Sequence, residues 1–277
     1  MKIQSSFFLI IFTFLVFSPL TRSEDRTMYY TSFYAKTAAE RSLLASYLHI
    51  DWFTGERAYS MVNAHDYKII KRHIPFLIAD SVSYDYSHLN WKGFGEYEFP
   101  EGDEAYHTYD EIIAALNSYA EKYPEIVSVF SIGKTIQERD IPAIRITKAK
   151  GQGLPGILFT GSHHAREHLS TEVPMLLIKH LVENYGKDEE ITKLINERDI
   201  TFVPLVNPDG ALYDILDRQY HVWRKNMRIY GSRPHGVDLN RNYSEGWGGP
   251  GSSDMPGSEI YRGSAPFSEP ETQAIKG

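Results

Sequence analysis

The chain has 277 residues, of which 42% are hydrophobic and 23% charged, with 20 glycines and 14 prolines. These proportions exclude collagen-like, low-complexity and wholly disordered architectures. The formal net charge of −7 gives no general attraction to nucleic acid or to an anionic membrane, which require an excess of lysine and arginine. Because the chain has no cysteine, any metal must be bound by histidine and carboxylate side chains.

The first 23 residues predict an export signal. Lys2 supplies a positive charge, residues 7–17 form an apolar run, and the small residues Thr21 and Ser23 are spaced as signal peptidase prefers. We therefore place cleavage near Ser23. A membrane anchor is the alternative, but the run is shorter than the roughly 20 residues that span a bilayer. We expect a secreted, extracellular protein, or a periplasmic one in a Gram-negative bacterium, with no stable membrane span after cleavage.

Residues 24–83 predict a small α+β unit. An aromatic strand is expected at 28–34 and a helix around Leu43 and Leu44. Strand-like sequence with a turn at Thr54 and Gly55 follows over 51–62, and a second helix at 67–72 leads into the apolar run 74–79. Residues 84–102 are rich in glycine, tyrosine and glutamate, lack periodicity, and are interpreted as a linker.

Residues 103–277 follow an α/β pattern. Thr108 and Glu111 form a capping-box sequence, which predicts a helix that ends before Pro124. Strands are expected at 126–132, 141–147, 156–161 and 200–206, with a helix over 171–185 that Gly186 ends. This alternation predicts a layered mixed sheet with helices on both faces, with its site at the carboxyl ends of the strands.

Candidate metal ligands follow the expected strand at 156–161. His164 and Glu167 are three residues apart, so one helical turn puts both side chains on the same side, where they suit a first-row metal such as zinc. Such a pair is common by chance, and a solvated surface turn is the alternative. Likewise, Arg224 and Arg241, each taken alone, are typical of exposed surface charges. Residues 207–210, taken alone, are typical of a tight turn.

Taken together and in order, these segments resemble the zinc metallocarboxypeptidases related to pancreatic carboxypeptidases A and B, and their bacterial secreted relatives. The resemblance covers about residues 106–277, and its motifs are GSHHARE (161–167), NPDG (207–210), WRKN (223–226), GVDLNRN (236–242), SEIYRG (258–263) and PFSEPET (266–272).

The resemblance implies one zinc ion as the cofactor. His164 and Glu167 correspond to the first two zinc ligands of the family. Asp238 corresponds to the carboxylate that orients the ligating histidine and fixes its tautomer. Residues 24–83 occupy the place of a propeptide, which would be released by cleavage in the linker; an unrelated accessory domain is the alternative.

The resemblance also implies a substrate site for a peptide or protein with a free C-terminus. Arg224 corresponds to the arginine that polarises the scissile carbonyl, and Asn240 and Arg241 to the pair that binds the substrate carboxylate, with Arg166 beside them. A guanidinium offers a planar, two-pronged match to a carboxylate.

The family's third zinc ligand, a histidine, and its catalytic glutamate have no counterpart before residue 277. We therefore expect an incomplete chain that is inactive alone and binds zinc weakly. None of the remaining histidines that we considered has a matching context; these are His163, His168, His180, His221 and His235. The alternatives are an inactive truncated binding module, and a cell-wall-peptide amidase or endopeptidase of the same superfamily. Asn240 and Arg241 argue against the endopeptidase, which has no terminal carboxylate to bind.

Overall fold

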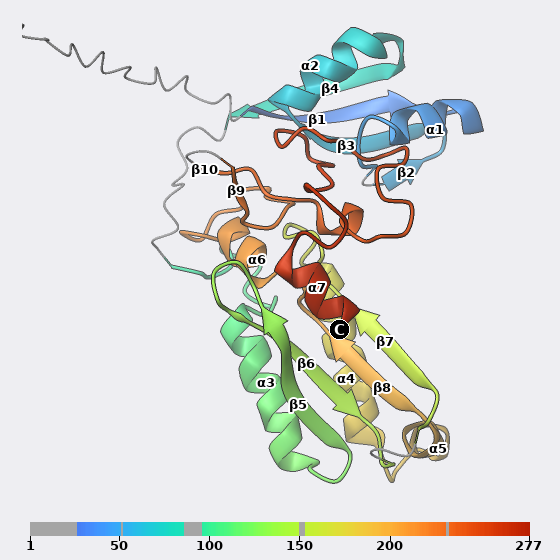
Figure 1. Ribbon diagram of the computed structural model, residues 1–277, viewed down its shortest axis with the longest axis vertical. Coiled ribbons are helices and arrows are strands. Elements are labelled where there is room, and N and C mark those ends of the chain that lie inside the picture. Colours follow the sequence, from blue (N-terminus) through green and yellow to red (C-terminus); the bar gives the residue numbers. More distant parts are fainter. Residues whose placement is uncertain (1–26, 51, 86–95, 150–152, 231–232) are drawn as a thin grey trace, which may run out of the picture.

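The computed structural model describes residues 27–50, 52–85, 96–149, 153–230 and 233–277 (Figure 1). The expected export signal and most of the expected linker lie outside these residues. Within the described part of the chain, no helix is both long and apolar enough to cross a bilayer.

The N-terminal unit is a four-stranded antiparallel sheet with strand order β2-β3-β1-β4. Burial alternates along β3, as expected of a strand with one face covered. The core joins Phe33 of the sheet to Leu44 and Ile70 of the two helices. Its elements are β1 (Thr27–Tyr34), α1 (Ala38–Ala45), β2 (Trp52–Thr54), β3 (Arg57–Asn63), α2 (Ala64–His73), the 3-10 helix η1 (Pro75–Leu77) and β4 (Ile78–Asp85).

The larger unit contains a mixed sheet with strand order β5-β6-β8-β7, in which only the β7–β8 pair is parallel. Two-residue strands β9 and β10 form a separate ribbon. The elements are α3 (Tyr109–Lys122), β5 (Val127–Lys134), β6 (Asp140–Ile146), β7 (Gly156–Thr160), α4 (Leu169–Asn184), α5 (Glu189–Glu197), β8 (Asp199–Val203), α6 (Pro208–Asp214), β9 (Ile229–Tyr230), β10 (Arg233–Pro234), η2 (Leu239–Arg241) and α7 (Pro270–Lys276).

Two apolar clusters cover this sheet. The larger one joins Leu116 of α3, Ile178 of α4 and Phe202 of β8. The smaller one joins Ala143 of β6 to Ile275 of α7, and α7 lies in front of the sheet as Figure 1 is drawn, whereas α3 and α4 lie behind it. The mixed α/β sheet that the sequence predicts is therefore present, with helices on both faces.

Edge strand β7 and part of α4 keep a large apolar surface exposed to solvent. Every residue of β7 is exposed. On α4 the apolar side chains Leu169 and Leu176 are 63% and 64% exposed. Contiguous exposed apolar surface of this kind is typical of interaction sites.

Most expected elements are confirmed, including the capping box at Thr108 and Glu111. The prediction missed α5 and wrongly interpreted residues 207–210 as a simple turn, because these residues begin α6. Asn207 caps that helix by accepting a hydrogen bond from the Gly210 amide at 3.1 Å, and Pro208 occupies the first helical turn, where its missing N–H costs nothing.

Candidate metal and substrate site

The candidate site begins at Gly161, directly after the last residue of β7. Its amide donates to Val203 at 2.9 Å and its carbonyl accepts from Val206 at 3.0 Å, which fixes the strand end against β8 and the segment after it. A Cβ atom built on Gly161 would lie 2.3 Å from the Ser170 carbonyl oxygen and 2.6 Å from the Pro204 carbonyl oxygen. Only glycine fits there, and the following turn carries His164 and Glu167.

We expect Gly161→Ala to destabilise the protein by about 1–3 kcal/mol or more, because both clashing atoms belong to the backbone and cannot rotate away. Chemical denaturation measures the loss. The matched control is Gly153→Ala, since a Cβ atom at Gly153 meets nothing within 4 Å, although its φ of +65° adds some backbone strain. Equal losses in the two variants would contradict the steric argument.

The imidazole of His164 lies between two carboxylates. Its Nδ1 is 2.8 Å from Oε1 of Glu167, and its Nε2 is 3.0 Å from Oδ1 of Asp238. A neutral imidazole carries one N–H only, so it cannot donate to both oxygens. If Nε2 donates to Asp238, Nδ1 offers a lone pair on the side of Glu167, where a cation would satisfy both atoms. This donor set fits a zinc ion.

Asp238 and Arg224 form a buried ion pair behind His164. Both side chains are 0% exposed, and Nη2 of Arg224 lies 3.0 Å from Oδ2 of Asp238. Burial alone would raise the pKa of Asp238, but Arg224 and the hydrogen bond from His164 outweigh it and hold that pKa far below its usual range. Burial also opposes ionisation of Glu167, yet His164 and Arg224 lower its pKa to about 2. Both carboxylates are therefore charged at neutral pH.

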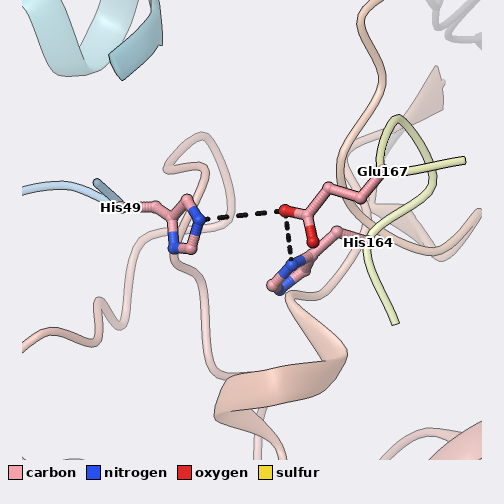
Figure 2. Close-up of side chains that lie close together, drawn as sticks. All are labelled: His49, His164 and Glu167. Carbon is pink, nitrogen blue, oxygen red and sulfur yellow. Dashed lines mark hydrogen bonds and ion pairs between the residues drawn. The ribbon is translucent and has the colours of Figure 1, made fainter. Parts of the chain in front are cut away.

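A third possible ligand comes from the N-terminal unit. Nε2 of His49 lies 3.8 Å from Oε1 of Glu167, and Figure 2 shows the ring facing Glu167 and His164. Burial, followed by the nearby positive charge of Arg224, lowers the pKa of His49 to about 3, so the imidazole is neutral. In the described part of the chain, His49, His164 and Glu167 are the only group of three or more such side chains placed to hold a metal ion.

The family model for zinc carboxypeptidases matches residues 112–276, which is more than half of the chain and contains His164, Glu167, Arg224 and Asp238. The chain belongs to the zinc carboxypeptidase family. It is 37% identical over 156 residues to a zinc carboxypeptidase of Saccharothrix mutabilis subsp. capreolus, covering 56% of this chain and 36% of that protein. It is 37% identical over 172 residues to mouse carboxypeptidase A4, covering 62% of this chain and 40% of that protein.

Two solved structures share the fold. A carboxypeptidase A from Helicoverpa armigera matches with a TM-score of 0.66 at 23% identity, covering 90% of this chain and 65% of that one. Bovine thrombin-activatable fibrinolysis inhibitor, solved with a tick carboxypeptidase inhibitor, matches with a TM-score of 0.54 at 31% identity, covering 62% of this chain and 54% of that one. The chain spans about two fifths of the length of the curated relatives described above.

The three residues that the family resemblance assigns to the substrate carboxylate are held by different contacts. Asn240 is exposed, and its backbone N–H donates to Oδ1 of Asp238 at 3.0 Å. Arg241 donates from Nε to the Gly251 carbonyl at 2.7 Å, and Arg166 pairs with Glu259 at 3.1 Å. Asn240 is thus tied through its backbone to the carboxylate that orients His164, whereas Arg241 and Arg166 are anchored to the 251–259 segment.

The five histidines whose sequence context is unsuitable for a third ligand lie outside the cluster of His49, His164 and Glu167. Several have polar partners elsewhere: Nε2 of His163 is 2.7 Å from the Tyr243 hydroxyl, Nε2 of His168 is 2.8 Å from Asp214, and Nε2 of His221 is 3.2 Å from the Leu216 carbonyl. His49 was missed altogether. No local motif marks it, because its place near His164 depends on how the N-terminal unit packs against the larger one.

Proposed function

We propose that this chain carries the zinc-binding and substrate-binding half of a secreted carboxypeptidase that hydrolyses the C-terminal peptide bond of peptides and proteins. The observation that carries the proposal is the placement of His164 between Glu167 and Asp238, at 2.8 Å and 3.0 Å. Family membership and the two buried charges behind the histidine support the same chemistry.

His164 and Glu167 would hold the zinc ion, which when bound lowers the pKa of a water molecule to about 7 and polarises a carbonyl. Asp238 keeps the Nε2 proton on His164 and so leaves Nδ1 free for the metal. Asn240 and Arg241, with Arg166 beside them, would bind the substrate carboxylate, which favours chain ends over internal bonds. Arg224 would stabilise negative charge that develops on the scissile carbonyl, as hydrogen-bond donors do in oxyanion holes.

We further propose that the exposed face of β7 and α4 is covered, in the active enzyme, by further polypeptide of the catalytic domain. Its apolar exposure supports this reading. That part would supply the family's third zinc-ligating histidine and its catalytic glutamate, so the present chain alone would not turn over peptides. Residues 1–23 would direct export, and residues 24–83 would act as a propeptide that is released in the 84–102 linker.

Zinc titration of the full chain against a chromophoric chelator tests this proposal. We expect one zinc ion per chain, and His164→Ala and Glu167→Ala each to weaken binding by more than about 100-fold, since loss of an outer partner alone costs 10–100-fold. His180→Ala is the matched control, because His180 lies exposed on α4 and contacts Asn184. Zinc affinity that is unchanged in the first two variants would overturn the proposal.

A further inference from the structure

His49 is held in place by the core of the N-terminal unit. Its neighbour Leu48 is 5% exposed and belongs to that core, against which Ile50 also packs. The His49 carbonyl accepts a hydrogen bond from the Ser60 hydroxyl at 2.7 Å, which ties this segment to β3. The side chain points out of the unit, toward Glu167 and His164 (Figure 2). Its position therefore follows from how the N-terminal unit is built and docked.

A second set of contacts fixes the docking. At the start of α2, Oδ2 of Asp66 accepts a hydrogen bond from the Glu259 amide at 2.8 Å. Asn63 donates to Oε1 of Glu259 at 3.2 Å and to the Gly257 carbonyl at 3.4 Å. The N-terminal unit is thus anchored to the 257–259 segment through polar groups.

The three side chains are spaced as ligands of one ion would be. A tetrahedral zinc ion with bonds of about 2.1 Å separates its ligand atoms by about 3.4 Å. Nδ1 of His164 and Nε2 of His49 lie 2.8 Å and 3.8 Å from Oε1 of Glu167, on either side of that value. All three ligand atoms lie within 4.8 Å of one another. Two imidazoles and one carboxylate are also a donor set of catalytic zinc sites.

We propose that His49 of the N-terminal unit ligates the metal ion bound by His164 and Glu167. The proposal rests on the zinc site proposed above. The metal ion would then bind side chains of both units. Metal binding would therefore favour docking of the N-terminal unit, and docking would raise the affinity for the metal by the same factor. Ligation by His49 also makes the docked form latent, because the metal position that His49 occupies is one that catalysis needs for water.

Metal titration of the full chain tests the role of His49. We expect His49→Gln to weaken zinc binding by at least about 10-fold and to change the visible absorption of the cobalt-substituted protein, because one imidazole leaves the ion. His73→Gln is the matched control, since His73 is an exposed histidine of the same unit. Circular dichroism of the metal-free variants checks that each is folded.

A second measurement needs no variant. Histidine modification by diethyl pyrocarbonate, followed by mass spectrometry, compares the wild-type chain with and without zinc. We expect zinc to protect His49 and His164 and to leave His73 reactive. Equal labelling of His49 in both states, or unchanged zinc affinity and cobalt spectrum in His49→Gln, overturns the inference. If zinc binding still depends on His164 and Glu167, only the role of His49 fails; if it does not, the proposed zinc site fails as well.

Discussion

Arg224→Met is expected to lower the free energy of unfolding by about 3–5 kcal/mol, because it leaves the Asp238 carboxylate buried without its cation. Nε and Nη2 of Arg224 lie 3.3 Å and 3.0 Å from Oδ2 of Asp238, and Nη1 lies 3.3 Å from Oε1 of Glu167. Neither Arg224 nor Asp238 has any exposed side-chain surface. Removing the guanidinium therefore leaves the Asp238 carboxylate fully buried without a positive partner.

The loss should depend on pH in a defined direction. The pKa of Asp238 is depressed in the folded protein, so ionised Asp238 contributes stability above the ordinary aspartate pKa, and this contribution is lost as pH falls through the depressed value. Without Arg224 the carboxyl takes up a proton more easily. The difference between Arg224→Met and wild type should thus be largest near neutral pH and shrink in acid.

Urea denaturation at pH 7.5 and at pH 4 measures both effects. Arg57→Met is the matched control, because Arg57 pairs with Asp80 at 2.6 Å on the surface, with 40% and 73% of the two side chains exposed. Exposed ion pairs contribute little to stability, so this variant should unfold close to wild type. A loss in Arg224→Met no greater than in the control would show that the buried pair is not needed for stability.

Local sequence patterns predicted the parts of the fold and site that depend on near neighbours. The hydroxyl and carboxylate of Thr108 and Glu111 cap α3 as their spacing indicates, and the short spacing of His164 and Glu167 brings their ligand atoms within 2.8 Å. In both cases the two residues lie within one turn of the chain, so their contact could be predicted without knowing how the rest of the protein packs.

Contacts between distant segments could not be predicted in this way. Taken singly, Arg224 had the pattern of an exposed surface charge, yet it is fully buried, because Asp238 and Glu167 compensate its charge. Only the family resemblance gave it a role at the site. His49 lies beside Glu167 because a separate unit docks there, and nothing in the sequence around it encodes that docking surface.

The second large effect concerns a buried carboxyl in α7. We expect Glu271→Gln to stabilise the protein above pH 7 by on the order of 3 kcal/mol, and by no more than about 1 kcal/mol near pH 5. The Glu271 side chain contacts Asn226 at 3.1 Å and the Ile136 amide at 3.4 Å. Burial, with smaller effects from Glu269 and Asp209, raises its pKa to about 7, from an ordinary value of 4.5.

The direction follows from the raised pKa. Between pH 4.5 and 7 the unfolded chain loses this proton while the folded protein keeps it, so the stability that Glu271 contributes is present below pH 4.5 and is lost as pH rises through 7. Glutamine resembles the protonated carboxyl in shape and carries no proton to lose. Stability measured by chemical denaturation from pH 5 to pH 8.5 should therefore fall less in Glu271→Gln than in wild type. Glu189→Gln is the control, because Glu189 is an exposed residue of α5, and its stability should follow the wild-type pH dependence. If the stability of Glu271→Gln fell with pH as steeply as that of wild type and of this control, burial would not be holding the Glu271 carboxyl neutral.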